Sequence, residues 1–594
     1  MKKIYWKFLL LCLCLSLGAC EEDIVIGEFQ PKDPELSFLT TSLEEIEEAG
    51  GEFIIELESN LPWRAKSNSD WISIDDPTSY GEATDKATIK IKVEKNKILE
   101  AREGSITVWI TNDYEKNFVV KQVAGTPPPI VKRHVYVKEN GKGTGASWDD
   151  ATSLSVALNE ELTAGDFIHI AAGSYSPSSS VTGGSETTES DKTFEIKENI
   201  IIIGGYPVDA KEGDVSNPND NVTELTGKSQ SNHVVTIVAP KVDDQKVTIT
   251  GVTITGGKAL SSGTVLINGT KYAGNYGGGI IIGNSVAELN DCTIQANIAN
   301  SGAGGVYAFA TAMLSMNRCI VDANSCIASS ANGGGVFVDG GATLEMNGGK
   351  VTNNSAGGFA GGVYAMKSIC RIYNMTIEKN AAGGAGATVT GKAYGGVYIR
   401  ESQSLLVNCT ISENISSNIG AGFGIYGTAA SPATADLISC TITENRLKNA
   451  SALGGGVYVN AAAAGASVNV YNSIISGNTR GVDGNNFASD EDGASGYVIT
   501  NKYSVVSDAV LDGEGKEVSS KFNFSTMFEK STAQGYKVYV LKGDNNPAKE
   551  QGMTQTALIE IGMNFTPQIS KDIIGFDQLG LNRDSKIYMG SCVK

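Results

Sequence analysis

The sequence has 594 residues, of which 41% are hydrophobic and 7% aromatic, with 70 glycines and 14 prolines. A chain of this length has room for several domains, and its glycine content favours a turn-rich β architecture. The formal net charge of −19 argues against nucleic acid as a partner, since so acidic a chain repels phosphate groups.

Residues 1–19 are typical of a bacterial lipoprotein signal peptide. Lys2 and Lys3 give a positive start, residues 8–17 form an apolar run, and Leu17-Gly18-Ala19-Cys20 matches the site at which such signals are cleaved. We therefore expect cleavage before Cys20 and lipidation of its thiol. An ordinary secretory signal with a chance cysteine is the alternative. Loss of the three leader lysines takes the net charge from −19 to about −22.

Residues 20–33 are predicted to be the lipidated cysteine followed by an acidic tether. The run Glu21-Glu22-Asp23 resembles a surface-export signal of lipoproteins from Bacteroidetes, and a plain solvated tether explains it equally well. No second apolar run of transmembrane length follows, so the anchor would be lipid alone. These features predict an outer-membrane protein that is lipid-anchored and exposed at the cell surface, with the membrane as a partner.

Residues 34–125 are predicted to form a small antiparallel β-sandwich. Apolar and polar residues alternate in segments 52–57, 87–93 and 105–110, which is the period of a strand with one buried face. Polar turns separate these segments, as expected for an immunoglobulin-like arrangement.

Four separated motifs within this segment resemble the BACON family: Leu61-Pro62-Trp63, then residues 69–74, 102–108 and 119–125. The resemblance implies a domain found on surface proteins that handle carbohydrate. Trp63 and Trp71 are candidate ligand-binding residues, because an indole ring can stack on a sugar face. Two alternatives stay open: both rings belong to the core of the sandwich, or the domain is a spacer.

Residues 126–132 form a proline-rich linker, and residues 133–594 are predicted to be one right-handed parallel β-helix with a cap at each end. For the first cap we expect a strand at 135–137, a helix over 150–162, and a strand and turn over 166–175. Residues 577–590 resemble the closing piece at the carboxyl end of bacterial β-helix proteins.

A unit that recurs seven times between residues 277 and 478 supports this prediction. Each copy contains a glycine-rich turn with a short strand, then an apolar strand, then an asparagine, and successive copies start 26 to 34 residues apart. Such a short unit cannot bury its own apolar face and must stack on its neighbours. The strands after the turns begin at Ile280, Val306, Val336, Val363, Val397, Ile425 and Val457. The asparagines are Asn297, Asn324, Asn354, Asn380, Asn414, Asn445 and Asn478.

Aligning the copies gives columns with distinct chemistry. The position three residues before each asparagine is always isoleucine or valine, and the position five residues before it is cysteine at 292, 319, 409 and 440. Polar residues fill the intervening positions, which predicts a strand with one wet face. The asparagine amides should hydrogen-bond along their column at the strand spacing of about 4.8 Å. The stacked cysteines are either free buried thiols or bridges between coils.

These Gly-Gly-(Ile/Val/Leu) repeats resemble the pectin-lyase-like β-helices of polymorphic outer-membrane proteins. Here Ile-x-x-Asn or Val-x-x-Asn replaces the Phe-x-x-Asn motif usual in that group. The resemblance implies an all-β solenoid at the cell surface and hardly bears on any reaction.

One column is aromatic and follows the first apolar residue of each turn strand. We expect it to point outward along one face, as a platform for sugar rings or for a partner protein. An inward aromatic stack is the alternative. After Ile281 in the first copy, its candidate ligand-binding residues are Tyr307, Phe337, Tyr364, Tyr398, Tyr426 and Tyr458.

The sequence assigns no catalytic residue, no metal ligand and no cofactor. Many polysaccharide lyases and hydrolases share the fold, and they need paired carboxylates, or a base beside a cation. Glu413 and Glu444 lie at equivalent outward positions one and two coils after Lys379, which we interpret as a surface charge ladder. The aspartates are too scattered for a calcium cage.

The leading hypothesis is a lipid-anchored surface protein whose β-helix binds glycan or another surface without catalysis. The first alternative is a polysaccharide lyase or glycoside hydrolase. The second is a structural or adhesive surface protein that recognises protein.

Overall fold

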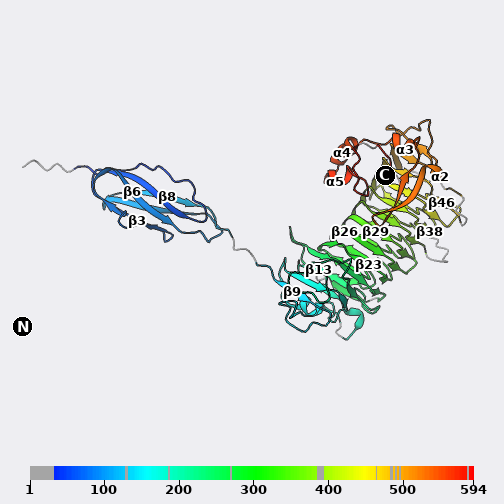
Figure 1. Cartoon of the computed structure of the whole chain (residues 1–594), viewed down its shortest axis with the longest axis horizontal. Coiled ribbons are helices and arrows are strands. Elements are labelled where there is room, and N and C mark those ends of the chain that lie inside the picture. Colours follow the sequence, from blue (N-terminus) through cyan, green and yellow to red (C-terminus); the bar gives the residue numbers. More distant parts are fainter. Residues whose placement is uncertain are drawn as a thin grey trace, which may run out of the picture. The chain divides into compact units, whose positions relative to one another are not determined.

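The computed structural model describes residues 32–126, 131–184, 187–261, 263–267, 270–383, 393–462, 465–481, 486–487, 491–493, 497–584 and 587–593. The chain divides after residue 131 into two compact units (Figure 1). The predicted lipidation site, Cys20, lies outside the described residues.

The first unit is the predicted sandwich. Its two sheets have the strand orders β1-β2-β6-β4 and β5-β3-β7-β8, and their neighbouring strands are antiparallel. Alternate positions of each strand fill the core, as Ile55 and Leu57 do from one sheet and Ile106 and Val108 from the other. The strands are β1 (Leu36–Phe38), β2 (Gly51–Ser59), β3 (Trp63–Ser67), β4 (Ile72–Ile74), β5 (Tyr80–Gly81), β6 (Thr84–Val93), β7 (Arg102–Thr111) and β8 (Tyr114–Gln122).

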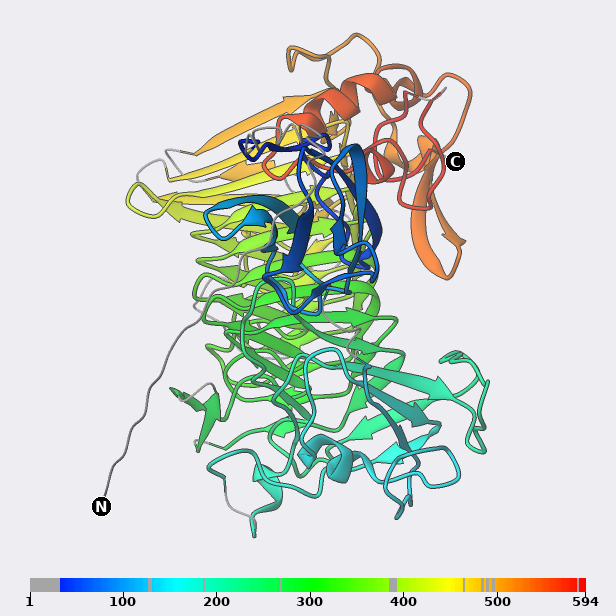
Figure 2. The same cartoon turned by 90° about the vertical axis from the view of Figure 1, so that its left-hand side faces the viewer.

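The second unit is a right-handed parallel β-helix, so the predicted fold class is confirmed. Its coils stack one above another (Figure 2), and each contributes strands to three long sheets. Sheet 1 contains β9 (His134–Val137), β10 (Phe167–Ala171), β11 (Gly173–Tyr175), β13 (Ile201–Tyr206), β14 (Thr223–Thr226), β16 (Val247–Thr250), β17 (Val252–Thr255), β22 (Val286–Asn290), β23 (Thr293–Gln295), β26 (Met313–Asp322), β29 (Thr343–Thr352), β32 (Ile369–Tyr373), β33 (Thr376–Glu378), β36 (Gln403–Val407), β37 (Thr410–Ser412), β40 (Ala433–Ile438), β41 (Thr441–Thr443), β44 (Ala466–Tyr471), β45 (Ile474–Ile475), β49 (Val498–Lys502), β50 (Val505–Val506) and β51 (Ala509–Val510).

The other two sheets are built from the turn strands and from short strands after the asparagines. Sheet 2 contains β12 (Phe194–Ile196), β15 (Val235–Ile237), β21 (Ile280–Gly283), β25 (Val306–Phe309), β28 (Val336–Asp339), β31 (Val363–Met366), β35 (Val397–Arg400), β39 (Phe423–Thr428), β43 (Val457–Ala462) and β48 (Glu491–Gly493). Sheet 3 contains β18 (Lys258–Ala259), β24 (Ile298–Ala299), β27 (Ser325–Cys326), β30 (Ser355–Ala356), β34 (Ala381–Ala382), β38 (Ile415–Ser416), β42 (Arg446–Leu447), β46 (Thr479–Arg480) and β47 (Asn486–Phe487). A hairpin of β19 (Thr264–Ile267) and β20 (Thr270–Ala273) extends from the early coils.

The lumen is filled by the predicted inward columns. The β-branched column is fully buried in one continuous core, and the cysteines at 292, 319, 409 and 440 lie in it as free thiols. Their sulfhydryls donate to backbone carbonyls, as Cys319 Sγ does to Leu289 O at 3.3 Å. The structure therefore shows thiols rather than bridges between coils.

The asparagine column forms the predicted ladder. Each Nδ2 donates to the Oδ1 of the asparagine one coil further along, at 2.9 to 3.0 Å from Asn297 through Asn445 to Asn478. The same Oδ1 atoms accept from backbone N–H groups, and all seven side chains are fully buried. The bend before each ladder residue requires a left-handed backbone, with φ between 52° and 55° from Ala296 to Glu444 and 75° at Gly477.

The amino-terminal cap differs in detail from the prediction. The two expected strands are present as β9 and β10, which pair in parallel, and the short helix η1 (Glu189–Asp191) lies in a loop. The cap helix α1 spans only Leu154–Asn159, because the side chain of Ser153 accepts from Val156 N and fixes its start. Leu154 and Ala157 seal the end of the lumen.

The carboxyl-terminal segment does not lie where the predicted closing piece would place it, at the end of the β-helix. The last coil ends with β49, β50 and β51, whereas the described residues 577–584 and 587–591 run along the outer face of sheet 1. Gln578 bonds to Thr410, and the buried guanidinium of Arg583 donates to Asn408 Oδ1 and Gly590 O. In Figure 2 the orange hairpin extends beside the coils, and the red helices lie near the end of the chain. These elements are α2 (Phe524–Met527), β52 (Phe528–Ala533), β53 (Tyr536–Leu541), α3 (Pro547–Glu550), α4 (Gln555–Met563) and α5 (Lys571–Ile574).

In the described part of the chain, every helix is too short or too polar to cross a membrane.

Candidate functional site

The aromatic column lies outside the lumen, but it is not an exposed platform. Tyr307, Phe337, Tyr364 and Tyr398 stack at ring-centroid distances of 4.8 to 5.2 Å and are at most 8% exposed. Side chains from the neighbouring turns, including Phe359, cover them and complete a second apolar core. The prediction that these four rings face solvent is wrong, because stacked rings present their faces to one another and the turns close over their edges.

The column also has a different register in the sixth coil. Tyr398 pairs with Gly424, and Tyr426 pairs with Arg400, so the predicted alignment of Ile425 and Tyr426 is two residues out. Phe423 takes the inward position because Gly422 is the glycine that packs against the ladder: a Cβ there would lie 2.8 Å from Asn445 Nδ2. Tyr426 and Tyr458 are half-buried beside the same core.

Tyr394 fills the space that Gly424 leaves in the aromatic column. Its ring stacks on Tyr398 at 3.8 Å, and a Cβ on Gly424 would come within 2.0 Å of Tyr394 Cδ1. The stack is thus completed by a residue from the preceding loop. Sequence alignment of the repeats could not have identified it.

The two sandwich tryptophans differ. Trp63 is 3% exposed and belongs to the core, which is the alternative that the sequence left open. Trp71 is half-buried, and the guanidinium of Arg102 lies 4.2 Å from its ring centroid. This cation–π contact occupies one face of the ring that a sugar would need.

A groove lies on the outer face of sheet 1 in the early coils. Its volume is about 280 Å³, and its lining includes Asn219, Val222, Thr253, Thr293, Arg318 and Ile320. Thr253, Thr293 and Ile320 are register neighbours on successive coils, so their side chains repeat at about 4.8 Å. Sequence reasoning missed this groove because residues 218–222 belong to a loop between strands rather than to the repeat.

Arg318 forms one wall of the groove through a bidentate ion pair. Its Nε and Nη2 donate to the two carboxylate oxygens of Asp291 at 2.7 and 2.6 Å. The pairing raises the pKa of Arg318, chiefly through its hydrogen bond to Asp291. No hydrogen bond to another described residue involves the hydroxyls of Thr253 and Thr293, so both can serve a ligand.

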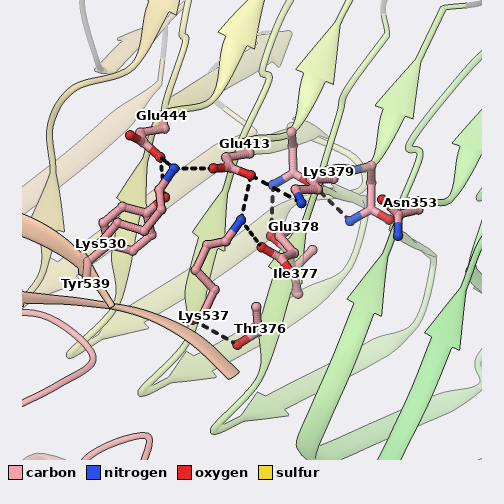
Figure 3. Close-up of polar contacts among 12 residues, drawn as sticks. Asn353, Thr376, Ile377, Glu378, Lys379, Glu413, Glu444, Lys530, Lys537 and Tyr539 are labelled. Atoms are coloured by element: carbon pink, nitrogen blue, oxygen red, sulfur yellow. Dashed lines mark hydrogen bonds and ion pairs between the residues drawn. The ribbon is translucent and has the colours of Figure 1, made fainter. Parts of the chain in front are cut away.

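The predicted charge ladder is one half of a larger cluster (Figure 3). Lys530 from β52 contacts both Glu413 and Glu444, and Lys537 from β53 lies 2.8 Å from Glu378 and 2.7 Å from Glu413. Three carboxylates at the ends of β33, β37 and β41 and two lysines of the hairpin therefore join segments far apart in the sequence. The lysines could not be assigned from the repeats, since they follow the last copy.

Electrostatics in this cluster favours attachment of the hairpin. Burial acts to raise the pKa of Glu413, but the hydrogen bonds and charges of Lys530 and Lys537 lower it to about 2. Burial and the neighbouring Glu444, which accepts from its hydroxyl at 2.5 Å, raise the pKa of Tyr539. A carboxylate with so low a pKa is a weak proton acceptor at neutral pH, so Glu413 is suited to binding the hairpin rather than to general acid–base chemistry.

Among the described residues, no group of three or more His, Cys, Asp or Glu side chains is placed to hold a metal ion. His134 and His169 approach to 2.9 Å between Nδ1 and Nε2, and burial followed by the charge of His134 lowers the pKa of His169 to about 4. His169 also contacts the Tyr206 hydroxyl at 2.9 Å. This stack belongs to the first coils and lies apart from the groove lining.

The fold and its columns define a two-domain β protein, a sandwich followed by a β-helix. Comparison with family models finds BACON, described as an N-terminal binding domain, at residues 61–123, and a right-handed beta helix region at residues 323–502. The resemblance to the BACON family and the prediction of a right-handed β-helix are thereby confirmed. Both domains together suggest a carbohydrate-binding or surface protein.

Other comparisons are less informative. No curated protein matches the sequence. A solved structure, a Bacteroides ovatus GH5 xyloglucanase in complex with a XXXG heptasaccharide, is similar at 14% identity and a TM-score of 0.14, over 29% of this chain and 45% of that chain. The match thus spans less than half of that structure, and no argument rests on it.

Proposed function

We propose that the protein is a lipid-anchored surface protein that binds glycan, without catalysis, in the groove between Asn219 and Ile320. The observation that carries the proposal is the chemistry of the groove lining. It combines two unengaged threonine hydroxyls, an exposed amide at Asn219 and the Asp291–Arg318 pair with apolar Val222 and Ile320. Short polar groups that hydrogen-bond hydroxyls, set beside small apolar surfaces, suit a saccharide.

Two further features support a glycan ligand. The net charge of −19 disfavours phosphate-rich partners, and the BACON domain suggests a carbohydrate context. The carboxylates of Glu378, Glu413 and Glu444, which lie on three successive coils, are engaged by lysines of the same chain. Binding without turnover is therefore the function that these residues favour.

The test uses the soluble protein from Glu21 onward on a glycan array. Release of reducing ends and of unsaturated uronates is assayed in the same wells. The variant Thr253→Val/Thr293→Val removes both hydroxyls with little change in shape. Each neutral hydrogen bond contributes about 1 kcal/mol, so affinity should fall about thirtyfold.

The matched control is Thr248→Val/Thr250→Val, which changes two half-buried threonines on the same sheet outside the groove lining. Equal affinity of the groove variant and the control would place the ligand elsewhere. Turnover of any substrate would replace the proposal with the lyase or hydrolase alternative, and binding to protein alone would favour the adhesive one.

Surface attachment needs its own experiment, in cells that express the full chain. Cys20→Ala should abolish incorporation of radiolabelled palmitate and release the protein from the membrane fraction. Protease added to intact cells should degrade the wild-type protein if it faces outward. Retention of Cys20→Ala in membranes would contradict lipid anchoring.

A further inference from the structure

A second hollow lies where the carboxyl-terminal segment meets the outer face of sheet 1. Its volume is about 100 Å³, and its lining includes Arg371, Gln403, Leu405, Thr434, Asp436 and Phe565. The first five come from β32, β36 and β40 on successive coils, and Phe565 follows α4. The hollow is separate from the groove, with which it shares no lining residue.

Arg371 is the unusual residue of this hollow. Arg371 is half-buried, yet within the described chain its guanidinium forms no hydrogen bond or ion pair. Elsewhere on this side of the molecule, Arg318 is paired with Asp291, and Arg583 is buried against carbonyl and amide oxygens. Glu345 is the register neighbour of Arg371 on the preceding coil, but no ion pair joins these two described residues, so the planar set of donors of Arg371 is available to a ligand.

The opposite end of the hollow has different chemistry. Arg371, Leu405 and Asp436 are register neighbours on three coils, so Arg371 and Asp436 are about 10 Å apart along the sheet. Asp436 Oδ1 accepts from Asn469 Nδ2 at 2.9 Å, which leaves Oδ2 able to accept from a ligand. Burial raises the pKa of Asp436. A ligand in this pocket therefore has its anionic end at Arg371 and its hydroxyls near Asp436.

A second outward column of the hollow lies two residues earlier on the same strands. Gln403 and Thr434 are exposed register neighbours, and neither side chain is engaged by another described residue. Leu405 forms an apolar floor, and Phe565 with Pro567 borders the other side. The hollow thus offers a cation, an apolar floor and a carboxylate in one column, with two neutral hydrogen-bonding groups in the column beside it.

We propose that this hollow binds one anionic sugar residue, with its carboxylate or sulfate ester on Arg371 and its hydroxyls on Gln403, Thr434 and Asp436. The inference shares with the proposed function only the premise that the ligand is a saccharide. Arg371 suits either anion because its planar fork donates two parallel hydrogen bonds. The net charge of −19 opposes anionic ligands over the molecule as a whole, so the attraction for the anion has to come locally from Arg371.

The experiment measures binding of three probes to the soluble protein by calorimetry at low salt. The probes are trigalacturonate, neutral galactose oligomers of the same length, and dextran sulfate. We expect trigalacturonate to bind at least tenfold more tightly than the neutral oligomers. Arg371→Gln should reduce its affinity about tenfold or more, as loss of a charge-assisted hydrogen bond implies, and Arg371→Lys should restore part of it.

The matched control is Arg446→Gln, which removes the same charge from sheet 3. Circular dichroism of each variant verifies folding. If Arg371→Gln and Arg446→Gln bind trigalacturonate equally, the inference is wrong. Binding of dextran sulfate that also depends on Arg371 supports the anionic site and shows that a sulfate ester suffices, whereas binding of trigalacturonate alone supports it with a carboxylate.

The two proposals fail in different ways. In one outcome, neutral oligomers bind tightly, and their binding is unchanged by Arg371→Gln and lost in Thr253→Val/Thr293→Val. That result would overturn this inference and leave the proposed function standing. Failure of every saccharide to bind would overturn both. Binding of anionic probes that depends on Arg371 but survives the groove variant would support the hollow and move the glycan site away from the groove.

Discussion

Replacing one asparagine in the middle of the ladder should destabilise the whole β-helix. The side chain of Asn380 takes part in four hydrogen bonds: Nδ2 donates to Asn414 Oδ1 and Val351 O, and Oδ1 accepts from Asn354 N and Nδ2. All of these atoms are buried. Asn380→Ala therefore removes four buried hydrogen bonds, although Asn414 Oδ1 still accepts from the backbone N–H of residue 380 and Asn354 Nδ2 still donates to Val321 O.

The magnitude follows from these contacts. At about 1 kcal/mol for each lost bond, and more where a buried group is left unpaired, the free energy of unfolding should fall by about 4 kcal/mol. Asn380→Asp should cost at least as much, because it keeps the acceptor, loses the donor and buries a charge. Asn347→Ala is the matched control, since Asn347 is half-buried on the outer face and accepts a single bond from Asn374 Nδ2.

The assay is equilibrium unfolding in guanidinium chloride, followed by far-ultraviolet circular dichroism. Midpoints are compared because a repeat array need not unfold in two states. The wild type and Asn347→Ala should unfold within a narrow range of denaturant, and Asn380→Ala at a clearly lower concentration. Midpoints of Asn380→Ala and Asn347→Ala that agree within error would refute the assignment of stability to the ladder.

Three other outcomes can be checked. Gly424→Ala should lower the free energy of unfolding, since its Cβ would lie 2.0 Å from Tyr394. A double-mutant cycle should show a smaller loss when the same substitution is made in Tyr394→Ala. The pKa of Glu413 is lowered to about 2 from an unfolded value of 4.5, so its contribution to folding stability is complete above pH 4.5 and is lost as pH falls towards 2. The difference in melting temperature between wild type and Glu413→Gln should therefore disappear over that range. A difference that stays constant would exclude the ion pairs of Glu413 as its source. Lys537→Ala leaves Glu378 without its partner at 2.8 Å, so limited proteolysis should cut within residues 528–541 faster than in the wild type. The control is Lys516→Ala, which changes an exposed lysine. Equal cleavage rates in the two variants would show that Lys537 does not hold the hairpin.

The repeated part of the fold was predictable because each column obeys a single physical rule. An isoleucine or valine three residues before an asparagine must face the lumen, and an asparagine that follows a left-handed bend can bond to its copies one strand away. Both features recur seven times, which is more often than chance would produce. The sandwich was predictable for the same reason, since alternation in segments such as 87–93 fixes which face is buried.

The rest depends on contacts that the repeat does not contain. Tyr394, Lys530, Lys537 and Phe565 lie in loops or beyond the last copy, and only the folded chain brings them to sheet 1 or to the aromatic column. The exposure of the aromatic column could not be read from alternation either. Alternation shows that a side chain points out of the lumen, but not whether a turn such as the one carrying Phe359 covers it.

The one-way direction of the asparagine ladder affects how the protein can change in length. Every amide donates towards the carboxyl end, so removal of a whole coil lets the two flanking asparagines meet with donor facing acceptor. Coils ahead of Thr376 can therefore be gained or lost as units during evolution. Between Thr376 and Asn472 the number of coils is fixed, because the carboxyl-terminal segment forms hydrogen bonds with particular coils. These bonds are to Thr376, Asn408, Thr441 and Asn472. The number of coils in the β-helix can thus vary towards its amino-terminal end, whereas the carboxyl-terminal segment sets the number of coils at the other end.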